Sequence, residues 1–283
     1  MTKGVLYVVA TPIGNLDDFS TRAVDTLRKV DLIAAEDTRH TRPLLRHYGI
    51  DTPMQSLHEH NERAQLEKLL ALLHEGKSLA LVSDAGTPLI SDPGFPLVRE
   101  VAAAGFDVVP VPGPSALTCA LSAAGLPTDR FLFAGFPPRG RSQRRRWFDD
   151  LAQQPATLVF YESGHRILSS LEDMAASFGS EREAVVAREL TKLHETFLRG
   201  DLAQLIERVS GDENQRKGEF VVLLAGAVPK RDSRSLTVSV DELLPLLLQE
   251  MPLKRVVSLL SELTGAKKNQ LYDQALKLKQ AKM

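Results

Sequence analysis

Residues 78–94 read SLALVSDAGTPLISDPG, an apolar run that stops at two similar Ser-Asp phrases. After Ser78, residues 79–82 are all apolar, which predicts a strand at 78–82 that is buried on both faces. The loop after it contains two glycines and two prolines. Glycine lets the backbone approach a ligand closely, and proline reduces the entropy that a loop loses on binding. This stretch therefore predicts a ligand-binding loop at the end of a buried strand.

The segments on either side of this stretch alternate between strand and helix. Apolar runs predict further strands at 5–10, 31–35 and 107–111. Capping residues, helix-ending glycines and apolar residues at helical spacing predict five helices. One of them is expected to begin with Thr38 or Thr41 as its cap and to end at Gly49. The other four are expected at 20–29 (capped by Ser20), 61–75, 95–104 and 114–124. This alternation predicts a mostly parallel sheet covered by helices.

A second α/β stretch begins near Phe131. Its strands are expected at 131–135, 156–161, 183–191 and 219–226. Its helices are expected at 142–153, from Ser163 as the cap to Phe178, and near 201–209. The fold class is therefore α/β, with a first domain at 1–117 and a second at 118–229.

The last part of the chain carries no strand signal. A polar linker, PKRDSRS, occupies 229–235, and apolar residues at helical spacing follow it. We expect a small helical module at 236–283, with a turn at Thr264-Gly265 between two helices. That spacing fits a helix-turn-helix that binds RNA, although it describes any helical hairpin equally well.

Composition excludes several classes of protein. No apolar stretch approaches the about 18 residues of a membrane helix, and the N-terminus lacks the features of a signal peptide. The one cysteine, Cys119, excludes an internal disulfide and a cysteine zinc cluster. We therefore expect a soluble cytoplasmic protein. Since the net charge is −1, a surface for nucleic acid must be a local patch.

Familiar phosphate and metal motifs are absent from the sequence or incomplete. No G-x-G-x-x-G follows the first strand, and a phosphate loop around Lys77 would need a glycine where Ala71 stands. The group His58, Glu59, His60 and Glu62 could ligate a metal, but it has no third histidine in register. We expect neither a nucleotide-phosphate site nor a metal.

Three loops, at 11–18, 83–94 and 112–116, follow strands of the first domain. The carboxyl ends of the strands in open α/β sheets are where ligands bind. The loops contain no basic residue, whereas Asp84 and Asp92 supply negative charge. They therefore predict a neutral or cationic ligand, with tight turns as the alternative. Asp92 is expected to cap the helix that begins at Phe95.

Arginines are concentrated at 139–146, where five occur in eight residues, followed by Trp147 and Phe148. Arginine binds phosphate bidentately and stacks on bases, as aromatic side chains do. The segment predicts an RNA-binding patch, with a solvated helix face as the alternative. Other charged clusters follow strands at 35–45, 160–166 and 188–195.

Several segments together resemble one known family. They are LYVVATPIGNLDD (6–18), AEDTRHTRPLL (35–45), LVSDAGTPLISDPG (81–94), VVPVPGPSA (108–116), FAGFPPR (133–139), FYESGHR (160–166) and RELTKLHE (188–195). The chain resembles the tetrapyrrole-methylase superfamily of S-adenosylmethionine-dependent methyltransferases, in particular its branch that acts on ribosomal RNA. The resemblance covers essentially the whole chain, including the helical module.

The resemblance implies two α/β domains with S-adenosylmethionine in the cleft between them, in a homodimer. It implies 2′-O-methylation of a cytidine ribose in small-subunit ribosomal RNA, near the decoding centre. The cofactor-binding residues that it implies are Pro12, Asp84, Gly86, Thr87, Ile90, Ser115, Ala116, Phe160 and Tyr161. A cationic sulfonium without phosphate agrees with loops that carry carboxylates and no arginine.

Methyl transfer requires alignment of the acceptor oxygen and removal of its proton. The candidate base or orienting groups are Glu36, Asp37, Glu189, Glu195 and Lys192, of which Lys192 is favoured as a base with a depressed pKa. The candidate RNA-binding residues are Arg39 and Arg166 near the cleft, with Arg139, Arg141, Arg144 and Arg145 on the arginine segment. The alternatives are a methyltransferase for a porphyrin precursor and a non-catalytic RNA-binding assembly factor.

Overall fold

A computed structural model describes residues 3–58, 61–228 and 240–280. The chain divides into two compact units, with the boundary after Val228. The first unit contains two five-stranded sheets, and the described part of the second contains helices only. Both α/β stretches that the sequence predicts thus belong to one compact unit.

The first sheet is parallel throughout, as the sequence predicts, with the strand order β3-β2-β4-β1-β5. The strands are β1 (Val5–Val9), β2 (Leu32–Ala35), β3 (Met54–Ser56), β4 (Leu79–Val82) and β5 (Asp107–Val111). All four residues of β4 are buried, which is why the strand reads as a continuous apolar run. The edge strand β3 was not predicted, because three residues of mixed polarity carry no periodic signal.

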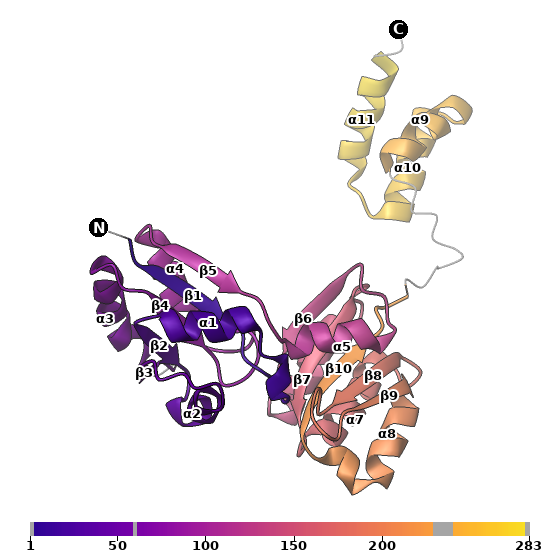
Figure 1. The fold of residues 1–283 in the computed structure, drawn as a ribbon. Coiled ribbons are helices and arrows are strands. Elements are labelled where there is room, and N and C mark those ends of the chain that lie inside the picture. The colour runs from indigo at the N-terminus through magenta and orange to yellow at the C-terminus, as the bar shows by residue number, and fades with distance from the viewer. Residues whose placement is uncertain (1–2, 59–60, 229–239, 281–283) are drawn as a thin grey trace. The chain divides into compact units, whose positions relative to one another are not determined.

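Helices cover both faces of the first sheet (Figure 1). One face is packed by α1 (Thr21–Lys29) and α2 (Thr38–His47), and the other by α3 (Glu62–His74) and α4 (Phe95–Ala103). Ser20 caps α1 as expected, since its side chain accepts a hydrogen bond from the Ala23 amide. The cap of α2 is Asp37 rather than Thr38 or Thr41, because its carboxylate accepts from the Arg39 amide.

The register of the first sheet brings four strand ends to one level. Ala35 pairs with Val82, and Val9 pairs with Val111. Val8 in turn pairs with Leu81, so β1 and β4 also end together. The segments that follow β1, β2, β4 and β5 therefore meet at a single edge of the sheet.

The second sheet is mixed, with the order β6-β7-β10-β8-β9. Its strands are β6 (Phe131–Gly135), β7 (Thr157–Ser163), β8 (Glu183–Arg188), β9 (Thr196–Asp201) and β10 (Glu219–Leu224). Only β6 and β7 pair in parallel. The strand expected at 183–191 ends at Arg188, because Glu189 and Thr191 have φ values of 51° and 62°, outside the range of a strand. Ser163 belongs to β7 and does not cap the following helix, whose N-cap is Arg166.

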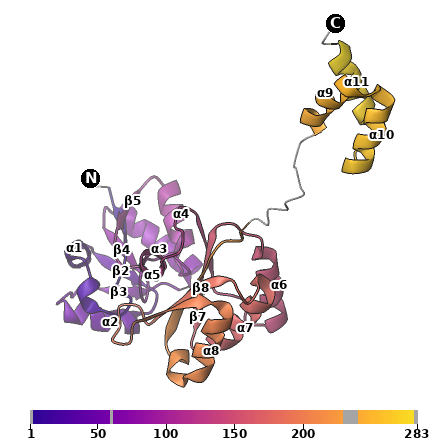
Figure 2. The same ribbon diagram turned by 90° about the vertical axis from the view of Figure 1, so that its right-hand side faces the viewer.

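Three helices pack on one face of the second sheet and one on the other (Figure 2). The three are α6 (Arg141–Leu151), α7 (Ile167–Phe178) and α8 (Leu202–Gly211). The opposite face is covered by α5 (Ala116–Ala124), where Leu117 and Leu121 pack with Val185 and Val221. The expected domain boundary at 117 thus falls inside a helix that packs on the second sheet. Short 3₁₀ helices occupy Leu16–Asp18 and Glu213–Arg216.

The second unit is helical, as predicted. It contains α9 (Val240–Glu250), α10 (Leu253–Thr264) and α11 (Lys268–Gln280) around a core that includes Leu244 and Leu260. Gly265 has a φ of 71° and ends α10, which explains the turn signal in the sequence. The linker expected at 229–235 lies outside the described residues. No described helix has the length and apolarity needed to cross a membrane.

Candidate functional site

A cleft of about 370 Å³ lies where the strand-end loops of the first sheet meet β7 and β10 of the second. The first sheet contributes residues at 13, 36, 84–87, 90–92, 115 and 116. The second contributes residues at 136, 161–163, 190 and 219–221. A cleft between the two α/β halves, which the family resemblance implied, is therefore present.

The loop at 83–94 is the centre of the cleft, because it is bonded to the three neighbouring strand-end segments. Thr11 and Gly86 exchange two backbone hydrogen bonds, of 2.8 and 3.1 Å. The Thr87 hydroxyl donates to the Pro114 carbonyl over 3.0 Å. On the remaining side, the amide of Asp84 donates to the Glu36 carboxylate over 3.2 Å. These bonds hold the loop in one conformation before any ligand arrives.

Backbone strain is concentrated in the segments around this cleft. Only four residues other than glycine have a positive φ within the described ranges: Leu89, Ser91, Glu189 and Thr191. The first two lie in the 83–94 loop, and the other two flank Leu190, which lines the cleft. Such conformations cost of order 1–3 kcal/mol each and recur at functional sites. No sequence pattern indicated these four positions.

The second sheet contributes an aromatic wall. Tyr161 and Phe136 line the cleft with their rings 5.5 Å apart at 65°. The Tyr161 hydroxyl accepts a hydrogen bond from the Leu117 amide over 3.1 Å. Burial raises the pKa of Tyr161, so its hydroxyl stays protonated. The hydroxyl thus joins β7 to the first turn of α5.

Most residues that the resemblance implied for the cofactor do line this cleft. They are Asp84, Gly86, Thr87, Ile90, Ser115, Ala116 and Tyr161. Pro12 lies between Thr11, which bonds to Gly86, and Ile13, which lines the cleft. Phe160 is not part of the lining. It is fully buried against Phe148 and Phe178, because neighbouring residues of a strand face opposite sides of the sheet.

The cleft is negatively charged, as its loops predicted. Its lining includes five carboxylates and no lysine, arginine or histidine from the described part of the chain. The two from the second sheet form ion pairs outside the lining: Glu162 with Arg166 at 3.1 Å and Glu219 with Lys192 at 2.9 Å. Glu36, Asp84 and Asp92 come from the first sheet and give that side a negative potential, although Asp84 also contacts the imidazole of His40 at 2.8 Å.

Asp92 lines the cleft and does not cap α4, contrary to the sequence prediction. The N-cap of α4 is Gly94, which offers no side chain, and Asp92 is half-buried. Desolvation raises the pKa of Asp92 to about 6 against the opposing effect of a hydrogen bond from Ser83. The negative charges of Glu36 and Asp84 raise this pKa further, by a smaller amount. Two Ser-Asp phrases of similar sequence thus both place their aspartate in the cleft.

Lys192 does not have the depressed pKa that a lysine base needs. Its ammonium group donates to Glu219 over 2.9 Å and to Glu189 over 3.1 Å. Desolvation lowers the pKa of Lys192, but these two carboxylates outweigh it, so the pKa is raised. Lys192 therefore remains protonated and joins the segment after β8 to the start of β10.

Of the other candidate bases, Glu36 lines the cleft, where its carboxylate accepts from the Asp84 amide. Asp37, Glu189 and Glu195 lie beside the cleft rather than in its lining. The Glu189 carboxylate accepts from the Glu219 amide over 2.9 Å, and the Glu195 carboxylate accepts from the Thr191 amide over 2.6 Å. Both thus brace the strained segment after β8. Asp37 caps α2 and binds Arg39 at 2.6 Å, and its pKa is held well below the usual range by that guanidinium.

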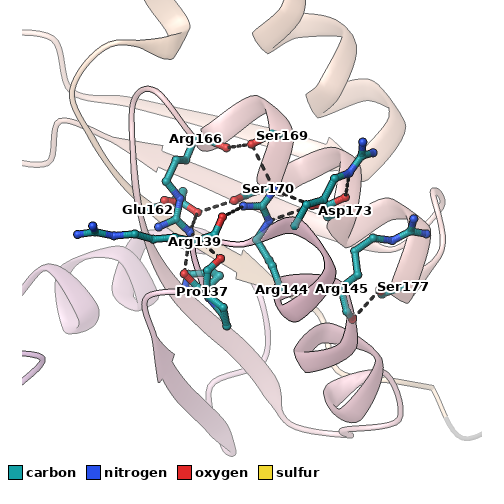
Figure 3. A network of polar contacts seen from close by, with 12 residues as sticks. Pro137, Arg139, Arg144, Arg145, Glu162, Arg166, Ser169, Ser170, Asp173 and Ser177 are labelled. Carbon is teal, nitrogen blue, oxygen red and sulfur yellow. Dashed lines mark hydrogen bonds and ion pairs between the residues drawn. The ribbon is translucent and has the colours of Figure 1, made fainter.

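Two of the predicted RNA-binding arginines are structural (Figure 3). Arg144 is buried and binds Asp173, itself fully buried, at 2.6 Å. Arg166 donates to the Pro137 carbonyl over 2.6 Å and to Glu162 over 3.1 Å. These bonds attach the 137–140 segment and α6 to α7. The Arg144 side chain is buried and not available to RNA, whereas the Arg166 side chain is 21% exposed.

The rest of the arginine segment is exposed. Arg139 and Arg145 contribute their backbone carbonyls to the network in Figure 3, as acceptors from Arg144 and Ser177. Arg141 binds Asp173 at 3.0 Å, but 70% of its side chain is exposed. Phe148, by contrast, is fully buried and cannot stack on a base. The segment thus presents a basic face on one side and core packing on the other.

No cluster of metal-binding side chains is found in the described part of the chain. Of the metal candidates in the sequence, Glu59 and His60 lie outside the described residues. Glu62 is buried at the start of α3.

The cleft also contains residues that the sequence patterns did not single out. Phe136 follows β6, so the rule that located the first-sheet loops could have found it. Glu162, near the end of β7, belongs to the charged cluster that the sequence indicated at 160–166, although it was not named individually. Glu219, Phe220 and Val221 begin a strand instead. They reach the cleft because β10 is antiparallel to β7, a pairing that no local pattern indicates.

Residues 5–206 match the family described as Tetrapyrrole (Corrin/Porphyrin) Methylases. The chain belongs to this family. A solved structure agrees in fold: the crystal structure of uroporphyrin-III-C-methyltransferase from Thermus thermophilus, at a TM-score of 0.56 and 20% identity. That match covers 79% of this chain and 94% of the other.

Closer relatives place the chain within one branch of the family. It is 53% identical over 276 residues to the Ribosomal RNA small subunit methyltransferase I of Pseudomonas aeruginosa, with 98% of each chain covered. It is 54% identical over 271 residues to the protein of the same name from Xylella fastidiosa, with 96% of this chain and 98% of the relative covered. Residues 235–279 match the family described as RsmI C-terminal HTH domain.

Proposed function

We propose that this protein transfers a methyl group from S-adenosylmethionine to the 2′-hydroxyl of a cytidine ribose in small-subunit ribosomal RNA. The observation that carries the proposal is the near-complete alignment, above 50% identity, with two proteins named Ribosomal RNA small subunit methyltransferase I. The acidic cleft supports it, because it suits a cationic methyl donor without phosphate. The proposal extends to a nucleotide near the decoding centre, a homodimer and a cytoplasmic location.

The cleft residues fit S-adenosylmethionine. This cofactor, when bound, supplies an electrophilic methyl group on a cationic sulfonium. The carboxylates of Glu36, Asp84 and Asp92 favour a cation on the first-sheet side. Tyr161 and Phe136 offer aromatic surface, which attracts both a cation and an adenine ring. Gly86, with a φ of 83°, lets the loop backbone pass close to the ligand.

Asp92 replaces Lys192 as the proposed proton acceptor. In-line methyl transfer needs alignment of the acceptor oxygen and removal of its proton. A general base works best with a pKa near the working pH, and the pKa of Asp92 is about 6. Asp92 is thus ionised at neutral pH yet more basic than an ordinary aspartate. Lys192 and Glu189 act by position, holding the opposite wall.

Two surfaces are proposed to hold the RNA. The first is the exposed side of the arginine segment, with Arg139, Arg141 and Arg145. The second is the helical unit, since helical domains of this type can place a basic helix against nucleic acid. Methylation of a porphyrin precursor is the competing function within the same fold.

The experiment offers labelled S-adenosylmethionine with three acceptors: small-subunit particles and free small-subunit RNA from cells lacking the protein, and a porphyrin precursor. The expected result is label on RNA ribose, mapped to one cytidine. Asp84→Asn is expected to weaken cofactor binding. Asp107→Asn is the matched control, because Asp107 is exposed at the amino end of β5. Label on the porphyrin alone, or on no acceptor, would overturn the proposal.

A further inference from the structure

The exposed face of α2 carries a stripe of basic side chains, which we call the α2 stripe: Arg39, Arg42, Arg46 and His47. With Pro43, these residues line a shallow surface pocket of about 410 Å³. They follow one another at the i, i+3, i+7 and i+8 positions of one helical face. No carboxylate of the described chain is among the residues that line this pocket.

Folding accounts for only one arginine of this stripe, Arg39, whose guanidinium binds the N-cap carboxylate of Asp37 at 2.6 Å. The opposite face of α2 contains Thr41 and Leu45, which are buried against the first sheet. Arg42 and Arg46 are exposed and form no ion pair with any residue of the described ranges. Adjacent cations on one helix repel one another, so this arrangement costs stability and favours an anionic partner.

The α2 stripe begins at the wall of the cleft. The Asp37 amide, at the N-cap of α2, donates to the Asp84 carboxylate over 3.0 Å. His40, in the first turn, contacts the same carboxylate at 2.8 Å. From there the ten-residue helix extends for about 15 Å. An RNA strand that reaches the cleft therefore has a row of cations directly beside it.

We propose that the α2 stripe binds backbone phosphates of the RNA strand next to the methylated ribose. The inference rests on the proposed function and adds a site to it. An acidic cleft suits the cofactor but repels a polyanion, so the RNA needs cations close to the point where it reaches the cleft. Arginine guanidinium groups bind phosphate bidentately and independently of base sequence. The stripe thus supplies affinity and position rather than sequence specificity.

The test compares two double variants of the full chain, Arg42→Gln/Arg46→Gln and Arg63→Gln/Lys68→Gln. The second pair is the matched control: both residues are exposed on α3, which covers the other face of the sheet. Binding to protein-free small-subunit ribosomal RNA is measured between about 50 and 200 mM salt. Removing one arginine–phosphate pair reduces the steepness of log K against log salt by roughly 0.7–0.9. We expect a reduction of about 1.5 in the α2 variant and none in the control.

Three results would decide against the inference. An unchanged salt slope in the α2 variant would overturn it, and so would an equal reduction in the control. A change in oligomeric state with RNA binding intact would assign the stripe to a protein interface instead. Cofactor affinity and melting temperature are measured for both double variants, and unchanged values show that the variants are folded. If the unmodified protein binds RNA with a steep slope but methylates nothing, the proposed function fails while the α2 stripe still stands.

Discussion

The imidazole Nδ1 of His40 lies 2.8 Å from the Asp84 carboxylate, which joins the first turn of α2 to the central loop of the cleft. The same carboxylate accepts from the Asp37 amide over 3.0 Å. Asp84 therefore stands between the acidic cleft and the α2 stripe. A change in the charge of His40 or Asp84 therefore alters the electrostatic potential at both surfaces.

His40 is expected to titrate above the usual pKa of 6.5, because its hydrogen bond and charge interaction with Asp84 raise the pKa. The interaction contributes stability fully below the unfolded pKa, and this stability disappears as the pH rises through the folded pKa. The contribution is small, since the His40 side chain is largely exposed. Titration of the His40 ring by NMR measures the shift, and Asp84→Asn should remove it. A ring that titrates alike in both proteins contradicts the assignment.

Asp92 is expected to govern the acid side of the pH–rate profile. If it accepts the proton, the single-turnover rate with saturating cofactor falls about tenfold per pH unit below its pKa of about 6. Bound cationic cofactor moves this limb to lower pH. Asp92→Asn should remove the limb and lower kcat far more than it weakens cofactor binding. A limb that persists in Asp92→Asn would assign the proton to another group.

Lys192 is expected to act through its charge and position. Its pKa is raised despite desolvation, because Glu219 and Glu189 hold the ammonium form. We therefore expect no lysine titration in the pH–rate profile near neutrality. Lys192→Arg should keep much more activity than Lys192→Ala, since arginine preserves the ion pairs but cannot serve as a base. Equal inactivation of both variants, with cofactor and RNA binding intact, would restore the lysine as the base.

Arg144 and Arg145 are neighbours in sequence with opposite expected roles. Arg144→Ala leaves buried Asp173 without its closest partner, so we expect a decrease of about 3–5 kcal/mol in the free energy of unfolding. Arg145→Ala should stay within about 0.5 kcal/mol, as is usual for exposed sites. The RNA salt slope should fall only for Arg145→Ala. Urea unfolding and RNA binding, measured on both variants, separate the roles, and a reversal of the two results would refute them.

Gly86 is expected to matter for the cofactor beyond its effect on stability. Its φ is 83°, and a Cβ there would approach Ile13 at 3.2 Å. Gly105 has a φ of 76° at the end of α4, with only the Lys3 ammonium near the corresponding Cβ position among the described residues. Alanine at either site has a similar backbone cost of about 1–2 kcal/mol. Only Gly86→Ala should weaken binding of S-adenosylmethionine, as calorimetry would measure; equal weakening in both would point to a global effect.

Much of the fold could be predicted from local patterns. The apolar run at 78–82 became a buried parallel strand and the run at 107–111 a parallel edge strand, and the glycines at 49, 76 and 265 end helices as expected. The strand β9 was missed because its residues, TFLRGD, are half-exposed and lack an apolar run. The cap of α2 was misassigned because aspartate and threonine stand side by side and are both good caps.

The candidate site was predictable on one side only. Loops that follow parallel strands are brought to one edge by the topology, so Asp84, Thr87 and Ser115 could be selected from the sequence. On the other side, the prediction of Phe160 was wrong, because Phe160 faces the core and its neighbour in β7, Tyr161, faces the cleft. Glu219 could not be selected at all, because it depends on an antiparallel pairing between distant segments.

The sequence by itself determined the order of most strands and helices, the acidic character of the ligand loops and the basic character of the arginine segment. These properties are local: they depend on periodicity, turn residues and charge along the chain. Only the tertiary structure decided which charged side chains are exposed to a ligand or to RNA, and in which protonation state. Burial beside Asp173 removes Arg144 from the surface, and burial in the cleft raises the pKa of Asp92. The charge and reactivity of a side chain depend on solvent and neighbours, which only packing brings together.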